Sequence, residues 1–315
     1  MRAVFLGPRG IRAGWRLLLF ALILAAIAAA IFVIVGKGVY LVGHHDVRAA
    51  LLSQRRSGKV TPAGIAFIEG VLLIAALMAA RIMSRIEHRP MGLFGLPLAQ
   101  AFRGKFWEGA LVGFCSISLV LLAISTIGDF RILGFREAAG AVVVDAIKWA
   151  AAFVIVGLSE EFFFRGYAQF TLTTGMRFWF AALLTSTAFA FAHTGNHGEG
   201  AIGIAHVFVF ALVLCLVLWR TGNLWFGAGF HFAWDWGETY FYGVPDSGFV
   251  TPHALLSSTF SGPAWLSGSG TGPEGSIFSI VVLLLVALYA WFRFRVESYA
   301  SDVGRNETAK TIGPK

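Results

Sequence analysis

Long apolar segments recur along this chain and constrain its fold more than any other feature. About 20 consecutive apolar residues form a helix that can cross the hydrocarbon core of a bilayer. The segments lack the alternation of apolar and polar residues that marks a barrel strand, so helices are the spanning element they predict. We therefore predict an all-α, polytopic membrane protein with about eight transmembrane helices. The predicted spans are residues 14–36, 63–83, 107–127, 141–172, 177–195, 201–219, 223–243 and 276–294.

The composition agrees with this fold and indicates an orientation. Hydrophobic residues make up 57% and charged residues 13% of the 315-residue chain, whereas soluble domains carry about 25% charged residues. The net charge of +8 reflects Lys and Arg gathered in segments expected on the cytoplasmic side, a bias that sets membrane orientation. We expect a bacterial inner-membrane protein with both termini in the cytoplasm, surrounded by a lipid bilayer and binding no nucleic acid. The expected parts are a basic N-terminus at 1–13, one integral domain at 14–296 and a polar cytoplasmic tail at 297–315.

Three ionisable residues interrupt the predicted fourth span: Glu160, Glu161 and Arg165. Each costs about 2.5–3.5 kcal/mol at the centre of a bilayer on insertion scales, so intramembrane charges usually mark function. Glu161 and Arg165 lie one helical turn apart and are expected to form an ion pair. Glu160 lies about 100° away on the helix and stays unpaired, and a buried carboxylate of this kind suits a general base. The alternative is a purely structural cluster of all three charges.

A histidine on the next span is expected to lie at the same depth as Glu160. The segment from Ala141 predicts one continuous helix as far as a turn at residues 174–176, and a second helix returns from Met176. With the centre of this hairpin at position 176.5, Glu160 precedes the centre by the same number of residues as His193 follows it. Phe189, one turn before His193, is expected to pack beneath the imidazole ring rather than react.

A second histidine and a third carboxylate share a face of the seventh predicted span. His231 and Asp235 are four residues apart, and intramembrane polar residues normally face the interior of the bundle. Counting helical rise puts Glu160 about 20 Å from the 174–176 turn and His231 about 12 Å into its own span. These depths agree only if the fourth and fifth helices protrude from the membrane. Glu160, His193, His231 and Asp235 form an N/O set that suits a divalent metal such as zinc, or metal-free activation of water.

Other polar residues and the longest outer loop complete the expectations. Glu69, His206 and Glu238 are candidates to line an intramembrane cavity. Residues 256–276 are rich in Ser, Gly and Pro, and this composition predicts a flexible outer loop. The two cysteines, at positions 115 and 215, are expected to pack as apolar residues without forming a disulfide.

Three short motifs on three predicted helices resemble those of one membrane protein family. They are EExxxR at Glu160, Glu161 and Arg165, FxxxH at Phe189 and His193, and HxxxN/D at His231 and Asp235. In this order they resemble the CPBP family of CAAX proteases and bacteriocin-processing enzymes, also called the Abi or type II CAAX prenyl endopeptidase-like family. The resemblance covers residues 141–240.

This resemblance implies an eight-helix intramembrane protease with its active site in a membrane cavity and a membrane-associated, sometimes prenylated, substrate. It implies that Glu160 and His193 activate water while His231 and the residue at 235 stabilise the oxyanion, in a mechanism now favoured to be glutamate-based and metal-independent. An ionised Asp235 could only accept hydrogen bonds, so this side chain is protonated, orients His231 or ligates a metal.

Two other classes of function remain open from the sequence. An ion- or proton-coupled transporter would also place charges in the membrane, although the chain shows neither a half-repeat nor paired Gly/Pro-broken helices of the kind that transporters use. A non-proteolytic membrane scaffold is the third class, and it would not require every acid and base of the motifs.

Overall fold

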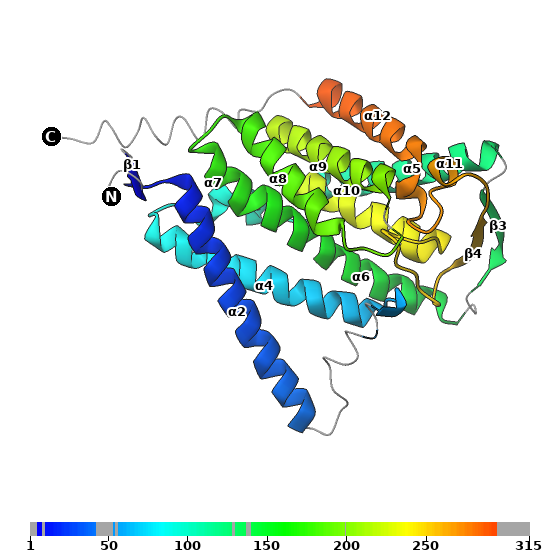
Figure 1. Ribbon diagram of the computed structural model, residues 1–315, viewed down its shortest axis with the longest axis horizontal. Helices are drawn as coiled ribbons and strands as arrows, with labels where there is room; N and C mark the ends of the chain where they lie inside the picture. Colours follow the sequence, from blue (N-terminus) through cyan, green and yellow to red (C-terminus); the bar gives the residue numbers. More distant parts are fainter. Residues whose placement is uncertain are drawn as a thin grey trace.

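A computed structural model describes residues 5–7, 10–41, 53, 56–127, 130–136, 140–198 and 200–294. The predicted tail at 297–315 and part of the predicted N-terminus lie outside these residues. Within them the chain is mostly helical, as predicted, and every predicted span contains helix (Figure 1). The α-helices are α2 (Ala13–Leu41), α4 (Pro62–Ile86), α5 (Gly104–Thr126), α6 (Val142–Glu160), α7 (Gln169–Thr173), α8 (Phe178–His193), α9 (Ala201–Thr221), α10 (Trp225–Trp236), α11 (Ala264–Ser267) and α12 (Ile277–Arg293).

Five helical segments in the described part of the chain are long and apolar enough to cross a membrane. They are Ala13–Gly38, Pro62–Ile86, Gly104–Thr126, Val142–Thr173 and Ala201–Thr221. Helices α8 and α12 are apolar but shorter. Large apolar side chains on the outside of the bundle are widely exposed, for example Ile34 at 70%, Leu111 at 65% and Phe292 at 80%. Exposed apolar surface on membrane-length helices fits contact with lipid.

The predicted fourth span is not one continuous α-helix. α6 ends at Glu160, and residues 161–168 form a π-helix, η3 (Glu161–Ala168), before α7 begins. Gly166 leaves helical geometry with φ −79° and ψ −110°, which kinks the helix. The seventh span is divided in the same way, because the π-helix η4 (Gly237–Tyr242) follows α10. π-Helical turns inside α-helices often occur at functional sites, and both π-segments here begin one or two residues after a predicted site residue.

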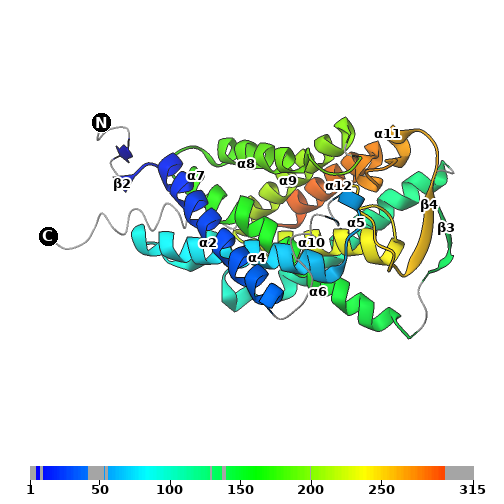
Figure 2. The same ribbon diagram turned by 60° about the horizontal axis from the view of Figure 1, so that its bottom comes forward.

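Helix α10 lies inside the bundle, between α5 and α6 (Figures 1 and 2). Glycines let the helices approach closely. A Cβ atom on Gly109 or Gly113 of α5 would lie 2.1 or 2.3 Å from a carbonyl oxygen of α10. A Cβ atom on Gly229 of α10 would lie 2.0 Å from the Phe106 carbonyl oxygen. Gly109 and Gly113 make a GxxxG pattern, which brings membrane helices into backbone contact and here fixes the helix that carries His231.

The predicted flexible loop at 256–276 is an ordered segment, so that prediction was wrong. Its first residues form β4 (Leu256–Phe260), which pairs antiparallel with β3 (Phe130–Phe135), and both strands lie at one end of the bundle (Figure 1). Ser267 and Ser276 are fully buried, because their hydroxyls bond backbone carbonyls within the loop. The other short elements are β1 (Leu6–Gly7), β2 (Gly10–Ile11) and the 3₁₀ turns η1 (Met91–Phe94), η2 (Leu98–Gln100) and η5 (Pro273–Gly275).

Candidate active site

One cavity of about 650 Å³ brings the predicted site residues together. Glu160 at the end of α6, His193 at the end of α8, and His231 and Asp235 of α10 all line it. Its size lies within the range of small-molecule and cofactor sites. The four residues predicted from three separate motifs therefore face one space.

Glu161 and Arg165 form the predicted ion pair, at 2.6 Å between Oε1 and Nη1. Both side chains are only 1% exposed. The same Glu161 oxygen lies 3.1 Å from Nδ1 of His231, so this carboxylate also orients the imidazole. Gly227 of α10 makes room for it, because a Cβ atom there would lie 3.1 Å from Glu161 Oε2. Glu161 thus connects the first motif to the third, a role that helical spacing did not predict.

The other ring nitrogen of His231 faces two carboxylates. Nε2 lies 3.5 Å from Glu160 Oε2 and 3.7 Å from Asp235 Oδ2. Both separations exceed hydrogen-bond length. The Glu160 side chain is 22% exposed, whereas those of Glu161 and Asp235 are 1% and 8% exposed. Glu160 is therefore the most exposed of these three carboxylates.

A backbone carbonyl of its own helix fixes which ring nitrogen of His193 carries a proton. Its Nδ1 lies 2.8 Å from the carbonyl oxygen of Phe189. A carbonyl oxygen only accepts hydrogen bonds, so Nδ1 carries a proton and Nε2 of the neutral ring is an acceptor. The Phe189 ring packs against the imidazole with centroids 4.5 Å apart, as expected, and its face lies 4.6 Å from the Arg165 guanidinium. Phe189 thus packs against both the His193 imidazole and the Arg165 guanidinium.

Further polar residues line the cavity from segments that the motifs do not include. Glu69 of α4 and His206 of α9 are among them, as expected, whereas Glu238 of η4 is not. Asp246 and Glu274 also line the cavity, and sequence reasoning missed both. They lie in connections rich in Gly, Ser and Pro, whose composition is typical of solvated loops and gave no signal for a buried site.

The pKa values of the two missed carboxylates, Asp246 and Glu274, are shifted in opposite directions. Burial, together with the negative charge of Glu274, raises the pKa of Asp246 to about 8. Burial alone would raise the pKa of Glu274 as well, but the His206 imidazole and the Ser247 hydroxyl lower it to about 2. His206 Nε2 lies 3.4 Å from Glu274 Oε1, and the Ser247 hydroxyl donates to Oε2 at 2.6 Å. Glu274 is therefore the ionised member of this pair.

The candidate metal ligands in the described residues are not the predicted ones. Glu238, Asp246 and Glu274 bring their donor oxygens within 4.8 Å of one another, and no three of the predicted set of four do so. Zinc binds N and O ligands at about 2.0–2.2 Å, so two ligands of one ion lie at most about 4.4 Å apart. Glu160, His193, His231 and Asp235 thus do not fit a shared zinc ion as they lie.

Comparison with known proteins gives a family match over the segment that contains the site. Residues 142–237 match the family model described as type II CAAX prenyl endopeptidase Rce1-like. The match spans all seven motif residues, from Glu160 to Asp235. A search of curated proteins gives no significant match. The apolar helices and the matched segment together show that this chain is a multi-pass membrane protein that carries an Rce1-like type II CAAX prenyl endopeptidase domain at residues 142–237.

Proposed function

We propose that this protein is an intramembrane endopeptidase that cleaves a membrane-associated peptide or protein with water activated by Glu160 and His193. The observation that carries the proposal is the cavity that collects Glu160, His193, His231 and Asp235 from three helices. Helix ends and a GxxxG contact hold these side chains, and rigid supports of this kind favour precise positioning of reacting groups. The family match supports a protease over the transporter and scaffold alternatives.

The first chemical step is attack of water on the scissile carbonyl carbon. Glu160 accepts one proton of the water, with the acceptor Nε2 of His193 holding the same water in place. The new C–O bond moves an electron pair onto the carbonyl oxygen and forms a tetrahedral oxyanion. His231, held through Nδ1 by Glu161, presents Nε2 toward the cavity and stabilises this charge when it is protonated. A water-poor cavity makes such stabilisation stronger than it would be in water.

The second step releases the products. The C–N bond breaks as Glu160 returns its proton to the amide nitrogen, which leaves as an amine, and the other product is a carboxylic acid. Asp235 donates to the oxyanion only in its protonated form. Its Oδ2 lies beyond hydrogen-bond distance of His231 Nε2, at 3.7 Å. We therefore assign Asp235 to the oxyanion side of the cavity and assign the orientation of His231 to Glu161.

The test uses purified protein in lipid and membrane-tethered peptides, prepared with and without a prenyl group. Glu160→Ala and His193→Ala should each lower cleavage by at least about 100-fold, the scale of general acid–base catalysis. Glu108→Gln is the matched control, since Glu108 pairs with Arg293 on the outside of the bundle. Cleavage at the parental rate in both site variants would refute the assignment. Preference for the prenylated peptide would define the substrate class.

Zinc dependence is tested in the same assay. Because the four residues do not fit a single zinc ion as they lie, the steps above use the protein's own groups. Unchanged cleavage after treatment with a zinc chelator supports this scheme. Loss of cleavage that added zinc restores would support ligation by Glu160, His193, His231 and Asp235 instead.

The proposed setting is a bacterial inner membrane with both termini in the cytoplasm. The clustering of Lys and Arg in the terminal segments and in alternate connections supports this orientation. Reporter fusions at the two termini test it, because a reporter that is active only outside the cytoplasm should stay inactive at both ends.

A further inference from the structure

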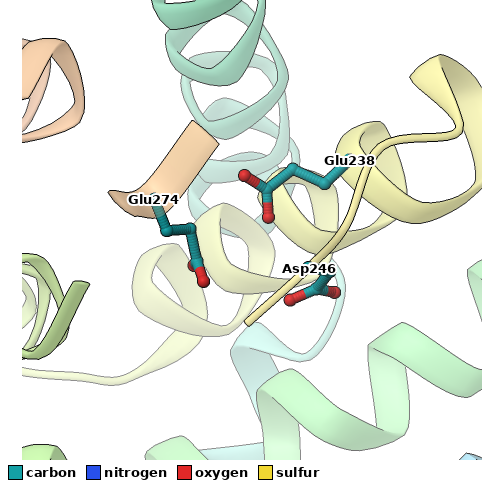
Figure 3. Close-up of side chains that lie close together, drawn as sticks. All are labelled: Glu238, Asp246 and Glu274. Carbon is teal, nitrogen blue, oxygen red and sulfur yellow. The ribbon is translucent and has the colours of Figure 1, made fainter. Parts of the chain in front are cut away.

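Three carboxylates converge beside the active-site cavity from three separate segments. Figure 3 shows Glu238 of η4, Asp246 of the following connection and Glu274 of η5 around one gap. Their donor oxygens lie within 4.8 Å of one another. Glu238 is 0% exposed and Glu274 6% exposed. None of the three is part of the family motifs or of the proposed chemistry.

Within the described residues, hydrogen bonds satisfy only some of the carboxylate oxygens in this cluster. Thr239 donates to Asp246 and Ser247 donates to Glu274. Both oxygens of Glu238 are buried and make no hydrogen bond of regular geometry, although the buried Trp234 indole N–H interacts with this carboxylate. A buried carboxylate normally requires a counter-charge or hydrogen-bond donors, because it has lost its hydration.

A second observation, from a different helix, points to the same gap. His206 of α9 is 1% exposed, and neither of its ring nitrogens makes a hydrogen bond of regular geometry. Its Nε2 faces Glu274 Oε1 at 3.4 Å. Even if this imidazole is protonated and balances Glu274, two further carboxylates have no cationic partner in the ion pairs of the described residues. Glu238 and Asp246 thus have no counter-charge for their ionised forms within this part of the chain.

We propose that Glu238, Asp246 and Glu274 bind one hard divalent cation that fixes the wall of the active-site cavity. An all-oxygen donor set suits calcium, magnesium or manganese rather than softer ions. Calcium binds oxygen at 2.3–2.6 Å and tolerates irregular geometry, whereas magnesium requires about 2.0–2.1 Å. Opposite ligands of one calcium ion lie about 4.8 Å apart on this scale, so three donor oxygens that lie within 4.8 Å of one another can share one such ion. Asp246 and Glu274 also line the cavity, which gives the ion and its remaining water ligands a route in.

The cation would connect three parts of the chain. Glu238 lies in η4, which continues the helix that carries His231 and Asp235, and Glu274 lies in η5, just before α12. Asp246 belongs to the connection between η4 and β4, whose residues Ser247 and Phe249 line the active-site cavity. Binding would hold this connection against the bundle, so removal of the ion should loosen the cavity wall as well as destabilise the fold.

The experiment measures metal binding and stability on the full-length protein, without reference to proteolysis. Protein stripped with EDTA is dialysed against calcium, magnesium or manganese, and bound metal is measured by mass spectrometry. The apparent melting temperature is followed over the same concentrations. We expect one calcium ion per chain, weaker binding of magnesium, and a melting temperature that rises with calcium, since a ligand of the native state alone stabilises it.

Charge-removing variants locate the ion. Glu238→Gln and Glu274→Gln should each weaken calcium binding at least tenfold. The control variant Glu108→Gln should bind calcium as the parent does, because Glu108 pairs with Arg293 and is not part of the cluster. In EDTA, Glu238→Gln should melt at or above the parental temperature, because one uncompensated charge is gone, and this result also shows that the variant is folded. Absence of stoichiometric metal in the parent, or parental calcium affinity in both cluster variants, would overturn the proposal in favour of carboxylates neutralised by protons.

Discussion

The bond network around Glu161 leads to a prediction that separates structural from catalytic carboxylates. Glu161 and Arg165 are 1% exposed and 2.6 Å apart, and Arg165 Nη2 is already buried without a partner. Replacing Glu161 with Gln removes the charge but keeps an oxygen that can accept from His231 Nδ1. It therefore leaves a buried guanidinium without its counter-charge. Breaking a buried ion pair on one side costs about 3–5 kcal/mol.

The neighbouring carboxylate should behave in the opposite way. Glu160 is 22% exposed to the cavity, so Glu160→Gln should change stability by less than about 1 kcal/mol while it abolishes cleavage. Glu161→Gln should lose more stability than Glu160→Gln but should keep part of the cleavage activity. The double variant Glu161→Gln, Arg165→Met should recover stability relative to Glu161→Gln, because both charges are then absent.

A thiol-reactive fluorogenic dye provides the stability assay in detergent. Cys215 is fully buried and Cys115 is exposed, so in a Cys115→Ala background the dye reports unfolding through Cys215 alone. Glu108→Gln is the control for the loss of a charge from an exposed pair, where Arg293 is 55% exposed, and it should cost at most about 1 kcal/mol. Parental stability of Glu161→Gln, or equal losses of stability in the Glu160 and Glu161 variants, would refute this reasoning.

Three further substitutions test the supports of the site. Gly229→Ala should lower stability by about 1–3 kcal/mol or more, because its Cβ would lie 2.0 Å from the Phe106 carbonyl oxygen. Gly70→Ala, with nothing within 4 Å, should be neutral or stabilising in the same melting assay, and equal effects of the two would contradict the close-contact argument. Asp235→Asn should retain cleavage within about tenfold, since an amide can donate to the oxyanion; a loss as large as that of Glu160→Ala would show that the charge is needed. Phe189→Leu should lower the free energy of unfolding by about 2 kcal/mol, because it removes the cation–π contact with Arg165. It should still cleave faster than His193→Ala, because Nδ1 of His193 bonds the backbone oxygen of residue 189, which the substitution keeps.

The motifs predicted four side chains that line one cavity, and helical spacing predicted the connections among the motif residues only in part. It paired Glu161 with Arg165, and that contact agrees, but Glu160, which it left unpaired, lies 3.5 Å from Nε2 of His231. It did not predict that Glu161 also holds His231, because those residues are 70 positions apart. The depth estimates for Glu160 and His231 disagreed, yet the two side chains lie 3.5 Å apart. The estimates treated both helices as straight and uniform, whereas π-segments and a kink at Gly166 interrupt that geometry.

The sequence alone predicted the membrane class, the helical segments and the residues proposed to carry the chemistry, because these depend on hydration costs and on periodicity within one segment. Only the tertiary structure decided which carboxylate orients which histidine, how closely α5 and α10 approach, and that the 256–276 loop is ordered. It alone also revealed the cluster of Glu238, Asp246 and Glu274, whose members come from three segments with no shared pattern. Contacts of this kind depend on packing between distant parts of the chain, and local composition carries no record of them.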